Sequence, residues 1–390
     1  MKIVILSMFS VPTGHTKVAE VLQDSIRQDY PDAEIKIIDF LSFSNPLLEK
    51  MISGVYFKWI RTSPESYKGF YQKVMMKDKE QSIFLRSISR FATYFEKKVL
   101  KVVEEEKPSL VICTHSFPSR MIGRLKSREG AIPCKTMNAY TDFFVNGVWE
   151  TGKIDYHLVP TAEVKETLIM HHNVSADRVY QTGIPVSDVF KSKDSSQSPR
   201  SKKGKHILVA GGNSGLCVWK NGIKDFSRYP DVHFSVLCGH NHRLYRSLIN
   251  QPNITPYMYI QDQEELNALY DSVDGIITKP GGVTISEVLH KKIPVFILDY
   301  LPGQEEFNLH YLVGQDLVFH IRDAEDFSSL EEILYDHKEI QHRVENMETY
   351  LSSLTGGLTD VLRKIQEETR QTIKVKSVKG KADIGVFLSS

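Results

Sequence analysis

A glycine turn in the second half of the chain could bind an anion. Residues 275–278 form a short apolar run typical of a buried strand, and Pro-Gly-Gly at residues 280–282 ends it. We expect a helix to begin here, with Thr284 as its N-cap and Glu287 three residues on, the spacing of a capping box. Free N–H groups at a helix start attract phosphate, and glycine lets the anion approach the main chain. The simpler alternative is a strand-to-helix turn with a structural cap.

Polar side chains follow the next predicted strand. Residues 294–298 are apolar, and Gly303, Gln304 and Glu305 come just beyond their carboxyl end. Ligands of open α/β sheets bind at this edge of the sheet. An amide can both donate and accept hydrogen bonds, and a carboxylate can accept two. The two turns together look like half of a nucleotide site.

Two residues near the start of predicted helices or turns could transfer a proton. His15 ends the turn after the first strand, residues 3–6. An imidazole with an ordinary pKa of ~6.5 can accept a proton at neutral pH. Asp142 follows the strand at residues 136–140, in a position similar to that of His115 after an earlier strand. The alternatives are a local hydrogen bond for His15 and a helix-capping role for Asp142.

Strands and helices alternate through both halves of the chain, which predicts an α/β fold with two Rossmann-like domains facing a cleft. A chain of 390 residues is also longer than one core usually supports. We expect an N-terminal domain at residues 1–188 and a linker at 189–205, a stretch rich in Lys and Ser. We expect a second domain at 206–355 and a C-terminal helix and tail at 356–390.

The sequences KPGGVTISE (279–287) and PGQEEFN (302–308) resemble the donor-binding half of family 28 glycosyltransferases. The specific resemblance is to monogalactosyldiacylglycerol synthases and bacterial diacylglycerol glucosyltransferases. It implies the GT-B arrangement of two domains, and transfer of a hexose from a UDP-sugar to a lipid acceptor such as diacylglycerol. The UDP-sugar is then a substrate, and no cofactor is expected.

The resemblance also implies roles for individual residues. It gives catalysis to His15 and Asp142. It gives the ribose to Glu287, with Gln304 and Glu305 contacting the hexose. The complete set implied for the donor is Gly14, Gly211, Gly212, Asn213, Lys279, Gly281, Gly282, Thr284, Glu287, Gly303, Gln304 and Glu305. The first glycine turn keeps only Gly14 and His15 of the family pattern, which weakens its phosphate role.

No Asp-x-Asp sequence occurs anywhere in the chain, so the usual ligands for a metal bridging the diphosphate are missing. We therefore expect metal-independent transfer, in which helix N-termini hold the charge of the leaving UDP.

Residues 50–101 combine twelve Lys and Arg with four Asp and Glu and ten aromatic residues. Basic and aromatic side chains on amphipathic helices suit an anionic lipid surface. In the resembling family this region is associated with the lipid acceptor. The residues predicted to face acceptor and membrane are Trp59, Lys68, Phe70, Tyr71, Lys73 and Lys77. A structural core explains part of the same pattern, and RNA binding is disfavoured because no nucleic-acid motif accompanies it.

Composition sets outer limits on partners and location. The formal net charge of +1 gives no overall attraction to nucleic acid. The four cysteines are far apart, which favours reduced residues in a cytosolic protein. We expect no secretory signal and no spanning helix, and therefore a cytoplasmic protein bound peripherally at the inner face of the cell membrane.

Two other functions fit the same donor site. A nucleotide-sugar epimerase could use this fold, although it would not need a basic, aromatic acceptor surface. A non-catalytic sensor of UDP-sugar would be consistent with the glycine-poor first turn. A nicotinamide oxidoreductase is less favoured, because neither glycine turn contains Gly-x-Gly-x-x-Gly.

Overall fold

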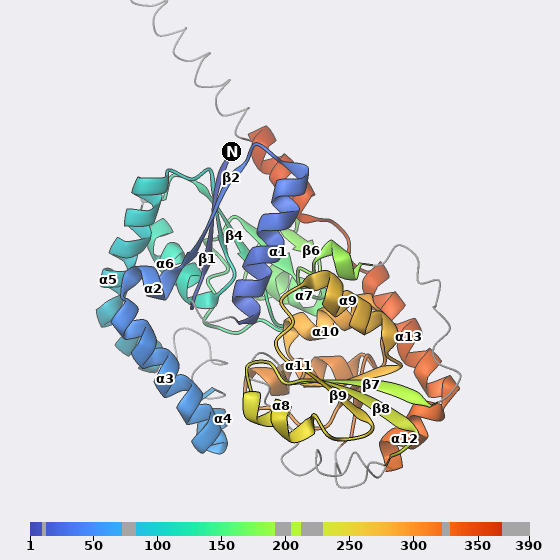
Figure 1. The fold of residues 1–390 in the computed structure, drawn as a ribbon. Helices are drawn as coiled ribbons and strands as arrows, with labels where there is room; N and C mark the ends of the chain where they lie inside the picture. The colour runs from blue at the N-terminus through green and yellow to red at the C-terminus, as the bar shows by residue number, and fades with distance from the viewer. Residues whose placement is uncertain are drawn as a thin grey trace, which may run out of the picture.

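The computed structural model describes residues 1–9, 13–71, 83–128, 130, 132–191, 204–211, 229–321 and 328–368. These residues form two six-stranded sheets, one from each half of the chain (Figure 1). All strand pairs within the two sheets are parallel. The predicted α/β fold with two Rossmann-like units is therefore confirmed.

The first sheet has the strand order β2-β1-β3-β4-β5-β6. Its strands are β1 (Lys2–Ser7), β2 (Glu34–Asp39), β3 (Leu110–Cys113), β4 (Lys135–Ala139), β5 (Tyr156–Val159) and β6 (Val179–Gln181). Its helices are α1 (Gly14–Asp29), α2 (Phe40–Ser44), α3 (Pro46–Thr62), α4 (Pro64–Phe70), α5 (Ile83–Glu106), α6 (Ser116–Lys126) and α7 (Ala162–Met170). Two short 3₁₀ turns, η2 (Ala176–Arg178) and η3 (Asp188–Phe190), flank the last strand.

The second sheet has the order β12-β11-β10-β7-β8-β9. Its strands are β7 (Lys205–Ala210), β8 (Val232–Leu237), β9 (Ile254–Tyr257), β10 (Gly275–Thr278), β11 (Val295–Ile297) and β12 (Phe319–His320). Its helices are α8 (His242–Leu248), α9 (Gln263–Ser272), α10 (Gly282–His290), α11 (Gln304–Gly314), α12 (Ser328–Tyr335) and α13 (His337–Ser352).

Central strands such as β1 are buried on both faces, which explains their continuous apolar runs. In β1, Ile3 and Ile5 belong to one hydrophobic cluster, whereas Val4 and Leu6 belong to another on the opposite face. Parallel sheets covered by helices on both sides require such continuous apolar strands. Parallel strands also direct all their carboxyl ends to one edge, so the polar turns that follow them gather there.

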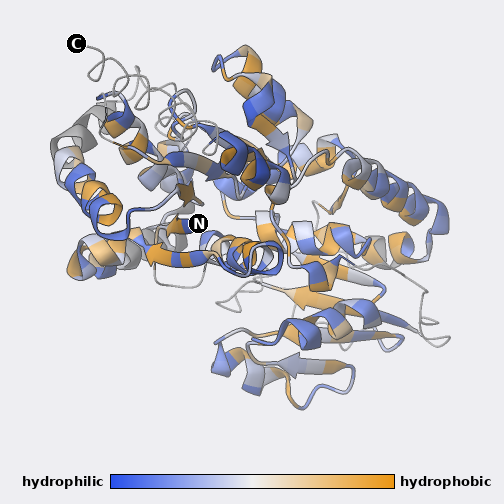
Figure 2. Cartoon of the chain, turned by 90° about the horizontal axis from the view of Figure 1, so that it is seen from above, coloured by the Kyte–Doolittle hydropathy of each residue, from blue (hydrophilic) through white to orange (hydrophobic). Residues whose placement is uncertain are grey.

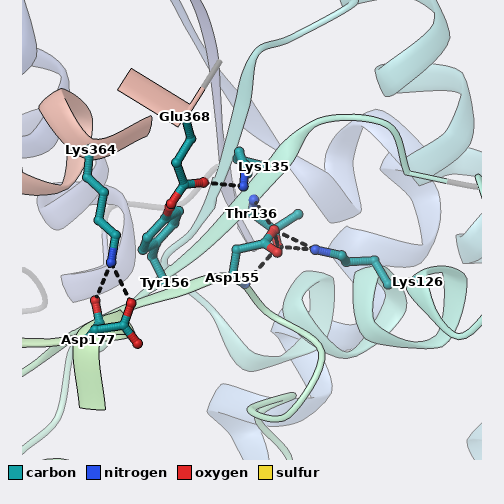
Figure 3. Close-up of polar contacts among 8 residues, drawn as sticks. All are labelled: Lys126, Lys135, Thr136, Asp155, Tyr156, Asp177, Lys364 and Glu368. Atoms are coloured by element: carbon teal, nitrogen blue, oxygen red, sulfur yellow. Dashed lines mark hydrogen bonds and ion pairs between the residues drawn. The ribbon is translucent and has the colours of Figure 1, made fainter. Parts of the chain in front are cut away.

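The end of the described chain returns to the first sheet. Residues 358–368 are helical. Figure 3 shows this helix beside the first sheet. The Lys364 ammonium lies 2.7 Å from the Asp177 carboxylate. The Tyr156 hydroxyl donates to the Glu368 carboxylate at 2.7 Å. The C-terminal helix therefore connects the second half of the chain back to the first.

The coloured helices in Figure 2 carry both hydrophilic and hydrophobic residues, as expected for helices with one buried face. In the part of the chain that the structure describes, no helix is both long enough and apolar enough to cross a membrane.

Candidate functional site

The N-termini of α1 and α10 meet between the two sheets. A Cβ atom added to Gly14, the first residue of α1, would lie 3.3 Å from the side chain of Val283, the second residue of α10. A Cβ atom on Gly282 would lie only 1.9 Å from the main-chain oxygen of Thr141. Glycine is therefore required at position 282 by contact between the two halves. At Gly281 an added Cβ atom would meet no atom of the described residues within 4 Å, so this part of the structure leaves room beside its main chain.

The prediction of a capping box at the start of α10 is wrong. The N-cap is Gly281, without a side-chain cap, so the helix begins earlier than predicted and Thr284 is its third residue. Glu287 is then too far along the helix to bond its start, which removes a capping role for this carboxylate. The donor roles assigned to Thr284 and Glu287 stay predictions.

Glu287 is buried with one polar partner from the neighbouring helix. Its side chain is 6% exposed, and the Tyr270 hydroxyl of α9 donates to its Oε2 at 3.0 Å. Burial raises the pKa of Glu287 to about 7, against the opposing effects of the Tyr270 hydroxyl and the Lys17 ammonium. Its carboxylate therefore changes charge near neutral pH.

His15 is held in one tautomer by its neighbours. Its Nδ1 lies 2.8 Å from the main-chain oxygen of Thr114 and 3.0 Å from the Thr141 hydroxyl. A carbonyl oxygen can only accept a hydrogen bond, so Nδ1 carries the hydrogen and Nε2 keeps a free lone pair. This is the arrangement that a general base needs.

A second histidine lies against the first. The ring centroids of His15 and His115 are 4.6 Å apart in an edge-to-face arrangement. The His115 Nδ1 accepts the Phe117 N–H at 3.0 Å, so this imidazole caps α6. Burial lowers the pKa of both imidazoles, although the Asp142 carboxylate partly opposes this for His15. Both rings are therefore neutral at pH 7, and His15 can accept a proton.

Asp142 is held from the other half of the molecule. The Asn308 amide of α11 donates to its Oδ1 at 3.0 Å, and the Gln304 amide lies 3.5 Å from its Oδ2. Burial raises the pKa of Asp142, and His15 and Asn308 oppose this rise. No helix begins at this residue in the described chain, so the helix-cap alternative is wrong. Asp142 instead belongs to the contact between the two halves.

The turn before α11 contains a glycine with a positive φ, a backbone conformation that other residues rarely adopt. Gly303 has φ +106°, and an added Cβ atom would lie 2.9 Å from the Tyr67 ring. The Glu305 Oε2 accepts the Leu301 N–H at 2.6 Å. Burial raises the pKa of Glu305, whereas the Lys279 ammonium lowers it. Gln304, Glu305 and Lys279 therefore lie in one region, at the carboxyl edge of the second sheet.

Part of the predicted membrane face is instead internal. Tyr71 is 1% exposed and packs with Tyr67 against the turn at Gly303, so the expectation of a lipid contact for Tyr71 is wrong. The Lys68 ammonium forms an ion pair with Glu306 of α11 at 2.8 Å. Trp59 and Phe70 are half-buried and join the same aromatic cluster, with ring centroids 5.1 Å apart. Aromatic residues here connect α3 and α4 to the donor turn.

Several expected residues cannot be placed. Gly212, Asn213, Lys73 and Lys77 lie outside the described residues. Gly211 is buried directly after β7, whose Ala210 pairs with Thr278 of β10. That register puts Gly211 at the same sheet edge as Lys279.

The sequence interpretation missed the residues that connect the others. Thr114 and Thr141 orient His15, Tyr270 contacts Glu287, and Asn308 contacts Asp142. Asn308 is the last residue of the 302–308 sequence and could have been singled out there. The others have no sequence signal, because their partners are distant in the chain.

Comparison with known proteins identifies similar glycosyltransferases. A family model described as monogalactosyldiacylglycerol (MGDG) synthase matches residues 15–186. An uncharacterized glycosyltransferase of Bacillus subtilis (strain 168), YkoN, is 33% identical over 95% of this chain and 97% of its own. A processive diacylglycerol beta-glucosyltransferase of Bacillus cereus (strain B4264) is 30% identical over 93% of this chain and 94% of its own.

Solved structures with the same fold are more distant in sequence. MurG of Acinetobacter baumannii has a TM-score of 0.61 at 12% identity, covering 94% of this chain and 99% of that chain. A UDP-GlcNAc 2-epimerase of Neisseria meningitidis, bound to UDP-GlcNAc, has a TM-score of 0.52 at 14% identity, covering 91% and 99%. These likenesses confirm the GT-B fold, which transferases and epimerases share, and carry no information on activity.

Proposed function

The chain belongs to the glycosyltransferase family of monogalactosyldiacylglycerol synthases and bacterial diacylglycerol glucosyltransferases, and we propose that it transfers a hexose from a UDP-sugar to a lipid acceptor such as diacylglycerol. The observation that carries this proposal is the similarity to a diacylglycerol glucosyltransferase over 93% of this chain. The arrangement of His15 between the two sheets supports it.

The donor would bind at the carboxyl edge of the second sheet. The start of α10 at the open Gly281 would receive the diphosphate, since helix N-termini attract anions. The Glu287 carboxylate would accept hydrogen bonds from the ribose hydroxyls. Gln304 and Glu305 would contact the hexose from the first turn of α11, with Lys279 adding positive charge near the phosphates.

The acceptor hydroxyl would then attack the anomeric carbon of the hexose. The new bond forms between the acceptor oxygen and this carbon, the bond from the carbon to the UDP oxygen breaks, and UDP leaves with the electron pair. The His15 Nε2 takes the proton of the hydroxyl, because its Nδ1 is committed to the Thr114 carbonyl. Asp142 favours the resulting imidazolium by its negative charge.

We also propose that transfer needs no metal ion, since the sequence lacks Asp-x-Asp. The charge that develops on UDP would be stabilised by the N-termini of α1 and α10, which meet at this point. Transfer that persists undiminished in EDTA supports this proposal, and transfer that requires an added divalent cation refutes it.

We also propose a peripheral position on the inner face of the cell membrane, and a lipid acceptor supports contact with the membrane. The basic and aromatic composition of residues 50–101 supports contact with anionic lipid. Because Tyr71 is buried, other residues of the segment would make this contact.

Mass spectrometry of lipids tests the proposed reaction. The protein is incubated with vesicles containing diacylglycerol and with several UDP-sugars in turn. A glycolipid heavier than diacylglycerol by one hexose supports transfer. Conversion of the UDP-sugar to an epimer without a glycolipid would instead support the epimerase, whose fold is the same. UDP binding with neither product would support a sensor.

A further inference from the structure

Asn308 is a buried amide that spans the contact between the two halves. It is 1% exposed and lies on α11, which belongs to the second half. Its Nδ2 donates to the Asp142 Oδ1 at 3.0 Å, and its Oδ1 accepts the Phe143 N–H at 2.8 Å. Both partners are in the turn after β4 of the first sheet. The Asn308 side chain therefore binds both the Asp142 carboxylate and the Phe143 main chain, which belong to the first half.

We propose that Asn308 is a positioning residue for the transfer reaction: it fixes the Asp142 carboxylate beside His15 and aligns the donor turn of α11 with the catalytic histidine. This inference rests on the proposed function. It concerns a buried residue that would act through Asp142.

The two hydrogen bonds need a donor and an acceptor on one side chain, and an amide supplies them from separate atoms. The Phe143 N–H requires an acceptor, and the Asp142 carboxylate requires a donor, so the orientation of the Asn308 amide follows from its partners. Aspartate at this position would keep the acceptor but place a second carboxylate against Asp142. An alanine would leave two buried polar groups without this partner, which is costly.

The position of Asn308 along α11 explains how it would affect transfer. Gln304, one turn earlier on the same helix, has its amide 3.5 Å from the Asp142 Oδ2. This distance is at the long limit for a hydrogen bond, whereas both Asn308 contacts are short. Asn308 is therefore the stronger anchor, and it leaves the Gln304 amide able to turn toward a hexose.

Asp142 is also connected to the base. The His15 imidazole favours the ionised form of Asp142, and the preceding Thr141 hydroxyl is 3.0 Å from the His15 Nδ1. A shift of the turn after β4 would therefore move both groups. Loss of Asn308 should reduce turnover while leaving UDP binding intact, because α10 and Glu287 belong to the second half alone.

A substitution cycle tests this coupling. The variants are Asn308→Asp, Asp142→Asn and the two together, all in the full chain. Asn308→Asp should lower kcat by about 10- to 100-fold, the loss expected for a hydrogen bond to a charged group. The calorimetric Kd for UDP should stay within about twofold. In the double variant, the new amide at 142 can donate to the new carboxylate at 308, which still accepts the Phe143 N–H.

The decisive comparison is the effect of Asn308→Asp in the two backgrounds. If Asn308 acts through Asp142, adding the change to Asp142→Asn should cost no more than about twofold in kcat, the scatter of additive changes. An equal loss of kcat in the wild-type and Asp142→Asn backgrounds, or no loss in the wild-type background, overturns the proposal. A matched control is Asn346→Asp on α13, whose amide donates to the Asp316 carbonyl far from His15, and it should keep kcat within about twofold.

Thermal unfolding keeps the test independent of activity. Asn308→Asp should lower Tm, and the double variant should recover most of that loss; a double variant as unstable as Asn308→Asp overturns the proposal. If Asp142→Asn has no measurable turnover, the Tm cycle tests the contact between Asn308 and Asp142. The loss of kcat in Asn308→Asp with an unchanged Kd for UDP then tests its role in transfer. Thermal unfolding also separates the two hypotheses: a wild-type protein that forms no glycolipid refutes the proposed function, while the Tm cycle still tests the contact itself.

Discussion

The titration of Glu287 should make donor binding depend on pH in a narrow range. Burial places the pKa of this carboxyl at about 7 in the unliganded protein. A ribose diol donates its hydroxyl hydrogens, so it binds the ionised carboxylate better than the protonated form. We therefore expect the affinity for a UDP-sugar to rise with pH through neutrality and then to level off.

The size of the effect follows from the fraction of protein that is ionised. With a pKa of about 7, about one part in eleven of the Glu287 carboxyls is ionised at pH 6, against about ten in eleven at pH 8. Binding only to the ionised form therefore makes the apparent Kd about tenfold higher at pH 6 than at pH 8. This corresponds to about 1.4 kcal/mol of binding free energy.

Calorimetry with UDP-glucose across this pH range provides the assay. Both phosphates of a UDP-sugar are esterified, so the ligand keeps its charge while the protein titrates. Glu287→Gln should bind more weakly and show no such pH dependence. Tyr270→Phe should move the midpoint to higher pH, because the Tyr270 hydroxyl lowers the pKa of Glu287. A wild-type Kd that is flat in pH, or an unchanged pH dependence in Glu287→Gln, would refute a ribose role for this carboxylate.

The buried Glu287 carboxyl should also lower the free energy of unfolding at pH values above its ordinary pKa. The folded protein keeps a proton that the unfolded chain releases above pH 4.5, the ordinary value. The free energy of unfolding should therefore fall as pH rises from about 4.5 to about 7 and stay constant beyond, a total of about 3 kcal/mol. Glu287→Gln removes this penalty, and its Tm at pH 8 should exceed that of the wild type. A lower Tm would contradict the burial argument.

Four further predictions concern the base, the two glycines of the turn and the membrane. His15→Ala should lower kcat by ~10²–10⁴-fold with little change in UDP affinity, and near-normal turnover would exclude His15 as the base. Gly282→Ala should destabilise the protein by about 1–3 kcal/mol in chemical denaturation, because its Cβ would overlap the Thr141 oxygen. Gly281→Ala should keep normal stability but weaken UDP binding, and equal Tm losses in the two alanine variants would contradict this distinction. Binding to anionic vesicles should fall steeply as salt increases, since exposed charges are screened beyond ~10 Å at 0.1 M, and salt-independent binding would argue against electrostatic docking.

Local sequence patterns predicted the units of the fold and the turns of the site. Residues 275–278 and 294–298 are short apolar runs, and the structure has β10 and β11 within them. Polar turns after parallel strands then had to gather at one edge. The start of α10 was predicted wrongly because Gly281 is its N-cap without any side-chain hydrogen bond, so the capping-box spacing was a coincidence of composition.

Contacts between the halves could not be predicted from local patterns. Thr141 and Gly282 touch although they are far apart in sequence, and periodicity within either segment contains no information on the other. The segment at residues 50–101 illustrates the same limit. Aromatic residues on amphipathic helices suit a membrane or a core equally, and only the packing of Tyr71 against the turn at Gly303 distinguishes them for that residue.

The contact between the halves also bears on the glycine-poor first turn. An anion near helix N-termini is stabilised mainly by backbone N–H groups, with each helix dipole contributing about 0.3–1 kcal/mol. Those N–H groups are present whatever the side chains are. A turn with few glycines therefore hinders the close approach of an anion but keeps the hydrogen-bond donors. Gly14 remains where α1 meets Val283 of α10. Because His15 comes from one half and the donor turns from the other, turnover should depend more on this contact, through Gly282 and Asn308, than on the number of glycines in the first turn.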